Sequence, residues 1–313
     1  MKFKNSPAIQ SHKAYLTELA SKVENPSVGF FGPSSMHWQL YREPSILFGS
    51  FRALLLQVAH PAVADGVRQH SNFKTDYLGR AHRTFTSMIH IWFGDTQQAT
   101  GSALRLYSIH SMIQGTVYGK KYTANEPHLL LWVLATLVDT TIVAYEKAKG
   151  PLSTTEKEQF FQESKWTAQL MGIPLDKYPE NWAAFSLYFN QMIHNGSLIV
   201  DEVSTTISLD LFDHYYWLKK ISRLVAAGFL PPPIRKSYGL AFSKQQEKKF
   251  HRLLKISKFV TNLIPPSLRY APPWHQAHYR LARTIGRSPS LLQRWYHWMG
   301  NNIKVYFFYN DIL

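Results

Sequence analysis

The chain has 313 residues, of which 45% are hydrophobic and 18% are charged, as is typical of a folded globular protein. It contains no cysteine, which excludes disulfides, thiolate metal sites, iron–sulfur clusters and covalent haem attachment through Cys-x-x-Cys-His. The formal net charge is +15, and the segment from Arg235 to Leu313 alone carries 14 Lys and Arg against two acids.

Helical periodicity dominates the sequence and alternating strand patterns are scarce, which predicts an all-α fold. Ser34 or Ser35 is placed to cap one helix, and Ser153 with Glu156 resembles a capping box that begins another. Proline and glycine positions divide the pattern into helices. The expected helices cover residues 7–23, 44–60, 61–69, 76–92, 97–118, 127–147, 154–171, 179–193, 208–227, 244–263 and 274–299.

Three regions are expected along the chain. Residues 1–28 form an N-terminal helix, residues 29–230 form one large helical domain, and residues 231–313 form a basic, aromatic-rich helical region. The run Pro231-Pro-Pro233 is the best candidate for a hinge between the last two. The C-terminal helices are expected to pack on the domain, because an apolar stripe needs covering. That stripe contains Phe250, Leu253, Leu254, Phe259 and Leu263.

Two polar motifs stand out within predicted helices. Arg80, Arg83 and Thr84 have i, i+3, i+4 spacing, so one helical face presents two guanidinium groups and a hydroxyl. His110 is a lone imidazole in an apolar stripe whose other members are Leu106, Ile113 and Val117. The spacing alone leaves two interpretations open. A lone helical histidine is more often a core or surface residue than a ligand, and a pair of arginines usually forms a solvated surface.

Several common kinds of site are excluded by spacing. No Gly-x-Gly-x-x-Gly, phosphate-binding loop, Gly-x-Ser-x-Gly elbow or His-Glu-x-x-His zinc motif occurs. No histidine has a glutamate three residues before it, which argues against a di-iron carboxylate bundle. His275 and His278 have spacing that suits a metal, although two histidines in a basic region are more often surface residues.

Haem is a cofactor that suits the motif around His110. It needs a neutral nitrogen ligand, aliphatic walls for the porphyrin and cations for its propionates. Leu106, Ile113 and Val117 are candidate walls, and the nearby Trp132 is another. Arg235, Arg269 and Arg280 are candidate propionate partners, with nothing in the sequence to rank them.

Asp139 is unusual because it interrupts the apolar run from Leu129 to Val143. A buried carboxylate requires a partner. It can orient a histidine ligand or pair with an arginine that binds a propionate. A salt bridge that holds two helices together is an equal alternative.

A longer series of motifs occurs in order along the chain: Arg52-Ala-Leu-Leu-Leu-Gln-Val-Ala-His-Pro61-Ala-Val-Ala-Asp-Gly66, Gln69-His-Ser71, Gly79-Arg80, Arg83-Thr84, Phe93-Gly94, His110, Gly115, Tyr122-Thr-Ala124 and Leu131-Trp-Val133. In their order and spacing, these motifs closely resemble the MpaB-type oxygenase family, which includes the latex-clearing rubber oxygenases. The resemblance covers about residues 32–174 and continues more weakly through 235–273.

The resemblance implies an all-helical fold that holds a non-covalent haem b and uses dioxygen on the carbon–carbon double bond of an isoprenoid-like substrate. His110 stands at the position of the family's proximal iron ligand and therefore is the expected metal ligand. Arg80, Arg83 and Thr84 match the distal cluster, with Arg83 in place of the lysine of rubber oxygenases. His60 and His70 are candidates for the same pocket, although structural roles suit them better.

The sequence therefore predicts a haem-dependent oxygenase whose partners are O₂ and a small apolar substrate. Because no secretion signal is recognisable at the N-terminus, a cytoplasmic location is expected, with peripheral membrane contact through the basic C-terminal region and no nucleic-acid partner. Two alternatives stay open: a haem-binding carrier or sensor without turnover, and a cofactor-free basic protein that binds a membrane surface or nucleic acid.

Overall fold

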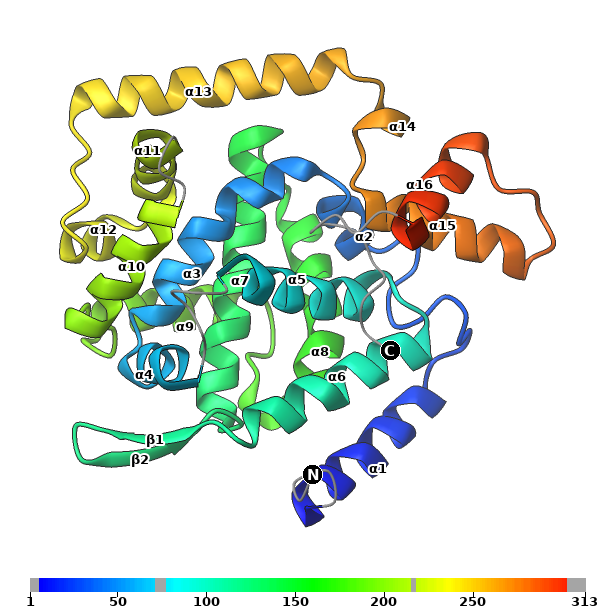
Figure 1. Ribbon diagram of the computed structural model, residues 1–313, viewed down its shortest axis with the longest axis horizontal. Helices are drawn as coiled ribbons and strands as arrows, with labels where there is room; N and C mark the ends of the chain where they lie inside the picture. The colour runs from blue at the N-terminus through cyan, green and yellow to red at the C-terminus, as the bar shows by residue number, and fades with distance from the viewer. Residues whose placement is uncertain (1–5, 71–76, 215–217, 303–313) are drawn as a thin grey trace.

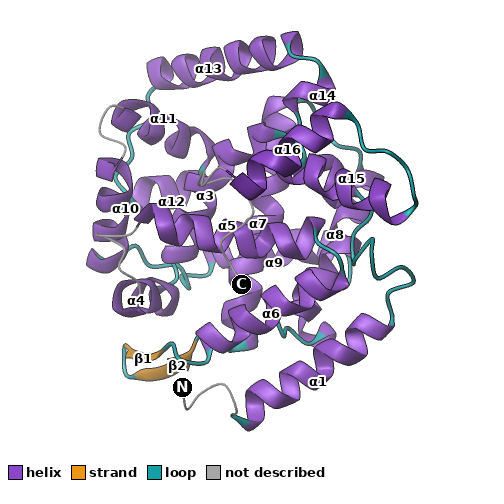
Figure 2. Cartoon of the chain, turned by 45° about the vertical axis from the view of Figure 1, so that its right-hand side comes forward, coloured by secondary structure: helices purple, strands orange, loops and turns teal. Residues whose placement is uncertain are grey.

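A computed structural model describes residues 6–70, 77–214 and 218–302 and confirms the all-α fold. Helices enclose α7, and a single two-stranded hairpin projects from the described part of the chain (Figures 1 and 2). The elements are α1 (Pro7–Ser21), α2 (Met36–Tyr41), the 3₁₀ helix η2 (Pro44–Gly49), α3 (Ser50–Val58), α4 (Pro61–His70), α5 (Tyr77–Phe93), α6 (Thr96–His110), β1 (Gln114–Val117), β2 (Lys120–Thr123), α7 (Pro127–Ala148), α8 (Thr154–Leu170), the 3₁₀ helix η3 (Leu175–Lys177), α9 (Trp182–His194), α10 (Glu202–His214), α11 (Lys219–Phe229), α12 (Pro232–Ser237), α13 (Lys244–Leu263), α14 (Pro266–Arg269), α15 (Pro272–Thr284) and α16 (Leu291–Asn302).

Helix α7 is the centre of the core. It contacts η2, α2, α3, α8 and α13, and most of its side chains are buried. Its length and hydropathy are sufficient to cross a membrane, but 67% of its most apolar window is buried inside the protein. The apolar composition of α7 is thus explained by its position in the core, where other helices cover it on several sides.

The predicted helix starts are confirmed where a side chain caps the first turn. The Ser35 hydroxyl accepts a hydrogen bond from the backbone N–H of Trp38 at the start of α2. Ser153 and Glu156 form the expected capping box of α8. These bonds satisfy N–H groups that have no partner inside the helix, which is why a short local motif is enough to locate a helix start.

The predicted helix over residues 97–118 is wrong beyond His110. The chain leaves α6 at this residue and forms the antiparallel hairpin of β1 and β2, with Gly115 opposite Tyr122. Tyr118 and Gly119 both have positive φ angles, 50° and 76°, as the tight turn between two antiparallel strands requires. Ile113 and Val117 consequently do not extend a helical stripe with Leu106 and His110.

Two further helix predictions need correction. The single helix expected over residues 208–227 is instead two helices, α10 and α11, and α10 begins six residues earlier than predicted. Residues 274–299 likewise form α15 and α16, which are separated around Gly286, where φ is 70°. In each case both helices bury an apolar face against the rest of the protein, so the apolar pattern continues from one helix into the next. Periodicity alone therefore does not show where the first helix ends.

The C-terminal region packs on the body, as expected, but its apolar stripe is only half covered. Phe250 is buried against Phe229 and Gly228, where a Cβ on the glycine would lie 2.5 Å from the phenylalanine ring. The predicted covering of Phe259 and Leu263 is wrong, since both side chains are exposed. Helix α13 runs along the edge of the molecule in both views, so only one side of it faces other helices (Figures 1 and 2).

The partner of Asp139 is Arg52, which joins α3 to α7. The guanidinium is buried and binds the Asp139 carboxylate through Nη2. It also donates from Nε to the Phe229 carbonyl oxygen at 3.0 Å and from Nη1 to the Thr140 hydroxyl at 2.5 Å. Of the alternatives for Asp139, the ion pair between two helices is the one present. The Arg52 side chain also connects the end of α11 to the core through its bond to Phe229.

Replacing Asp139 with Asn leaves the buried Arg52 cation without its counter-charge. We expect the free energy of unfolding to fall by about 3–5 kcal/mol in urea denaturation, because a buried charge that loses its partner is strongly destabilising. Asp176→Asn is the matched control, since the pair of Asp176 with Lys177 is exposed and should contribute little. Equal losses in the two variants would contradict the role assigned to Arg52.

Candidate functional site

Helices α5 and α6 meet at a tight reversal and spread apart from it toward their other ends (Figure 1). Gly94 permits the reversal, because a Cβ there would lie 2.2 Å from the carbonyl oxygen of His90. Asp95 then caps α6 in a capping box with Gln98. Near the reversal, His90 Nδ1 lies 2.8 Å from the Ser102 hydroxyl and links the two helices.

The reversal places the two sequence motifs on opposite arms of this pair. At a rise of about 1.5 Å per residue, Arg80 lies about 21 Å along α5 from Gly94, and His110 lies about 22 Å along α6 from Asp95. Both are therefore near the ends of the arms where the helices are farthest apart (Figure 1).

His110 is the last residue of α6 and is half-buried. Burial lowers the pKa of its imidazole from 6.5 to about 4, so the ring is neutral at physiological pH. Among the described residues, no side chain or backbone group forms a hydrogen bond with this ring. A neutral imidazole meets the electronic requirement for an iron ligand.

The α5 residues are less completely defined. Arg80 and Arg83 lie in α5, but their side chains are outside the part of the structure that is described. Thr84, one turn further along, is exposed. Their predicted distal roles therefore stay predictions based on residue type and on their position along the helix.

A cluster around Asp65 fixes the chain directly after His110. The Asp65 carboxylate accepts hydrogen bonds from the Tyr122 hydroxyl at 2.8 Å and from the Gln69 amide at 2.7 and 2.8 Å, and it pairs with Arg68 at 2.7 Å. Burial opposes ionisation of this carboxyl, but these bonds together lower its pKa. Gly115 fits against the cluster, since a Cβ there would lie 2.8 Å from both Asp65 Oδ2 and the Tyr122 hydroxyl.

This cluster gives a physical reason for several motif positions that the sequence left unexplained. It connects α4 to the hairpin, and a methyl group of Ile113 lies against Gly66 on the same helix. The Ile113 N–H donates to the His110 carbonyl oxygen at 3.0 Å, and the Ile113 carbonyl oxygen accepts from Ala124 at 2.9 Å. The segment that follows the candidate ligand is thereby held at both ends.

The predicted apolar walls occupy different environments. Leu106 is half-buried and packs against the main core, and Ile113 is half-buried in the turn before β1. Trp132 is fully buried in that core, where its indole N–H donates to the Leu56 carbonyl oxygen at 3.1 Å and its ring stacks on Phe189. Contact of these residues with a cofactor stays a prediction.

The candidate propionate partners are all bound to other groups. Arg269 forms a two-point ion pair with Glu43, and Arg235 donates to the Ala227 carbonyl oxygen at 3.0 Å. Arg280 donates to the Phe93 carbonyl oxygen at 2.8 Å. Sequence reasoning did not single out Arg105 on α6, whose buried Nη1 has no hydrogen-bond partner among the described residues.

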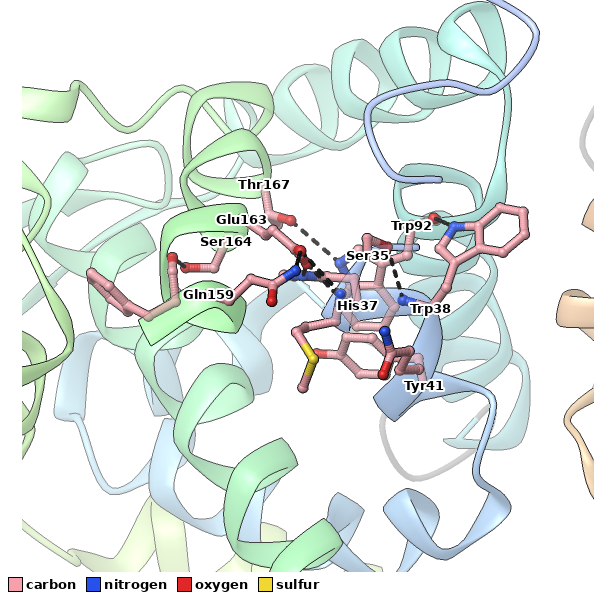
Figure 3. Close-up of polar contacts among 12 residues, drawn as sticks. Ser35, His37, Trp38, Tyr41, Trp92, Gln159, Glu163, Ser164 and Thr167 are labelled. Atoms are coloured by element: carbon pink, nitrogen blue, oxygen red, sulfur yellow. Dashed lines mark hydrogen bonds and ion pairs between the residues drawn. The ribbon is translucent and has the colours of Figure 1, made fainter. Parts of the chain in front are cut away.

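A buried network that the sequence did not reveal supports α5 from the other side (Figure 3). Glu163 of α8 accepts hydrogen bonds at 3.0 Å from the backbone N–H groups of Met36 and His37, and His37 Nδ1 lies 3.0 Å from the same carboxylate. The neighbouring Trp38 indole donates to the Trp92 carbonyl oxygen at 2.8 Å. The α2 segment thus connects α8 to the end of α5.

Other histidines have structural surroundings. The His60 ring lies 6.4 Å from that of His128, and its buried Nδ1 has no hydrogen-bond partner among the described residues. Burial, with a smaller effect of His128, lowers the pKa of His60 to about 4. The side chain of His70 lies outside the described residues, so its predicted proximity to the pocket is untested.

His275 and His278 provide no support for a metal site. His275 is buried and stacks on Tyr296, while the His278 ring lies against those of Trp38 and Trp274. Within the described ranges, no group of three or more His, Asp or Glu side chains is placed to hold a metal ion. A haem iron differs in this respect, since it needs only one or two axial ligands from the protein.

A cavity of about 580 Å³ lies elsewhere, beside the Arg52–Asp139 pair. The Phe189 ring forms part of its wall and lies 5.6 Å from the Arg52 guanidinium carbon. Of the predicted site residues whose side chains are described, namely Thr84, Leu106, His110, Ile113 and Trp132, none lines it. Its lining consists of Arg52, Asp139, Val143, Ser186, Phe189, Asn190, Ile193, His194, Pro231, Pro232 and Pro233.

Comparison with known proteins gives one family. The family model described as "ER-bound oxygenase mpaB/B'/Rubber oxygenase, catalytic domain" matches residues 38–259. Uncharacterized proteins of Mycobacterium bovis and Mycobacterium tuberculosis are each 23% identical over 222 residues, which cover 68% of this chain and 87% of the relative. No solved structure matches the chain significantly. The matched region includes α5, α6, the hairpin and the cavity, and it ends within α13.

Acidification should weaken the fold as the pH falls from about 6.5 to about 4. In this range the unfolded chain binds a proton at His60 while the folded chain does not, so unfolding takes up a proton and stability is lost as the pH falls. His60→Asn removes this imidazole and should reduce the pH slope of the unfolding free energy by up to about one proton. Asn is the chosen replacement because it is a favoured residue directly before a helix. His251→Asn replaces an exposed histidine and is the matched control for the substitution. Identical slopes in both variants and the natural protein would exclude His60 as a contributor.

Gly115→Ala should destabilise the protein by about 1–3 kcal/mol, because the added methyl group overlaps Asp65 and Tyr122. Gly101→Ala is the matched control, since a Cβ at this exposed position in α6 meets no atom within 4 Å. Alanine is the better helix former, so the control should gain roughly 0.5–1 kcal/mol. Urea unfolding measures both, and a neutral Gly115→Ala variant would contradict the packing described.

Proposed function

The chain belongs to the family of ER-bound oxygenase mpaB/B' and rubber oxygenase catalytic domains, and on that premise we propose that it is a haem b-dependent oxygenase. Its substrates are dioxygen and an apolar molecule that contains a carbon–carbon double bond, of the isoprenoid kind. His110 would bind the haem iron, and Arg80, Arg83 and Thr84 would line the part of the pocket where dioxygen reacts.

The state of His110 is the observation that carries this proposal. Its imidazole is half-buried, it is neutral at physiological pH because burial lowers its pKa to about 4, and no described group binds the ring. A buried imidazole that has no hydrogen-bond partner among the described residues is free to bind iron through a ring nitrogen, and that bond would offset the cost of burying the ring. The donor set therefore fits a haem that is held by one imidazole.

The segment after His110 supports the same role. Helix α6 ends at the histidine, and the hydrogen bond from Ile113 to its carbonyl oxygen fixes the turn that follows. The Asp65 cluster anchors this turn to α4, so the imidazole sits on a backbone that is constrained on both sides. Such support is what keeps a ligand in its binding geometry.

The residues of α5 contribute charge and hydrogen-bond donors. Bound haem iron supplies the chemistry that activates dioxygen. Arg80 and Arg83 are permanently positive, and Thr84 offers a hydroxyl, so this part of α5 carries the groups that stabilise negative charge on a reacting oxygen. Arg105 on α6, whose buried Nη1 has no hydrogen-bond partner among the described residues, is a further cation for an anionic group of the cofactor.

Substitution of His110 tests the axial assignment. Protein purified from cells supplied with haem precursor should show a Soret band and bind haem b, and His110→Ala should lose most of both because the iron loses its protein ligand. His128→Ala removes an exposed imidazole and is the matched control. Added imidazole should restore the Soret band of His110→Ala, which separates loss of the ligand from loss of the fold. A normal band at full occupancy in His110→Ala would overturn the assignment.

Turnover is tested separately, by oxygen consumption with squalene and with its saturated analogue squalane. Consumption with squalene alone would support an oxygenase that acts on double bonds. Haem binding without consumption of oxygen on squalene would contradict the proposed activity.

A further inference from the structure

The outer face of α13 exposes large apolar side chains that no described part of the protein covers. Ile256, Phe259, Val260 and Leu263 are 51%, 66%, 48% and 68% exposed. Their spacing is i, i+3, i+4 and i+7, so they form one continuous stripe along the helix. We name these four residues the α13 stripe. An exposed apolar stripe of this size on a folded protein marks an interaction surface.

The stripe lies on the side of α13 that faces away from the protein. Phe250 anchors the helix to α11 and α7, and Phe259 follows it by nine residues, which corresponds to the opposite side of a helix. Lys258 also holds the helix to the body by donating to the Lys149 carbonyl oxygen at 3.1 Å. Figure 1 shows α13 along the upper edge of the molecule, with its outer side free of other described elements.

Basic residues accompany the stripe. Helix α13 carries six Lys and Arg against one acid, Glu247. Lys248, Arg252 and Lys255 are exposed and follow one another at i, i+4 and i+7 on the outer side. Their positive charge is complementary to an anionic surface, whereas a second copy of the same helix would meet it with like charge. Nucleic acid would match the charge but would leave the apolar stripe in water.

We propose that the outer face of α13 docks the protein on an anionic lipid bilayer. The stripe enters the boundary between headgroups and acyl chains, while the basic residues contact the anionic headgroups, as in interfacial amphipathic helices. Docking by this face leaves α5, α6 and the hairpin on other parts of the protein (Figure 1). The proposal requires no haem and is independent of the proposed function.

Vesicle sedimentation with the full chain tests the proposal. The protein should bind vesicles that contain about 30% phosphatidylserine more tightly than pure phosphatidylcholine vesicles, and raising NaCl from about 0.1 M to about 0.5 M should weaken binding. The double variant Phe259→Ser with Leu263→Ser should bind vesicles at least about tenfold more weakly than the natural protein, because the apolar contribution to binding is lost. Lys248→Ala with Arg252→Ala should remove most of the preference for phosphatidylserine.

The control is Leu175→Ser with Leu187→Ser, which removes two exposed leucines outside α13 and should leave binding unchanged. Circular dichroism and melting temperature establish that each variant is folded. Absence of vesicle binding, or equal loss in the stripe variant and the control, would overturn the proposal. Two other results would also overturn it. In the first, the stripe variant binds vesicles and a DNA duplex with the same affinity as the natural protein. In the second, the stripe variant loses a dimer and has no other defect.

Discussion

Helix α7 carries the Asp139 carboxylate within an apolar run, and that charge is tolerated in the interior because the Arg52 guanidinium meets it there. The guanidinium also binds Thr140 and the Phe229 carbonyl oxygen, so one side chain connects α3, α7 and the end of α11. The remaining helices pack around this connected centre. Most of α7 is buried as a result, and its apolar composition is a consequence of its place in the core.

The candidate site depends on a second constraint, which is local. Helix α6 ends at His110, and the chain turns directly into a hairpin that Asp65 and Tyr122 hold against α4. Gly115 makes this close approach possible, since any side chain there would overlap both groups. The candidate ligand thus stands where a rigid helix meets a fixed turn. Asp65, Gly115 and Tyr122, which are separated in the sequence, therefore meet beside the turn that follows His110.

The proposed oxygenase and the proposed membrane surface involve different parts of the chain. The site residues lie on α5 and α6, within the region that the family model matches, whereas the α13 stripe spans the end of that region. The two proposals have a chemical connection nonetheless. An apolar substrate is more concentrated in a bilayer than in water, so docking on lipid would bring the protein to its supply.

The sequence by itself determined the all-α class and most helix starts, because these depend on local patterns. Ser35 and Ser153 cap their helices as the motif predicts, since a cap involves only residues three positions apart. The family resemblance selected His110 where spacing alone favoured an ordinary core residue. A family model that matches residues 38–259 confirms the family, whereas the role of His110 stays a prediction.

Only the tertiary structure decided where α6 ends, what pairs with Asp139 and which half of the α13 face is covered. Each of these depends on contacts between residues far apart in the chain: Asp65 with Tyr122, Arg52 with Asp139, and Phe250 with Phe229. Ile113 and Val117 are four residues apart, a spacing that places two side chains on one face of a helix and equally on one face of a strand. The contacts of the hairpin with α4 decide between the two structures, and they join residues that are far apart in the chain.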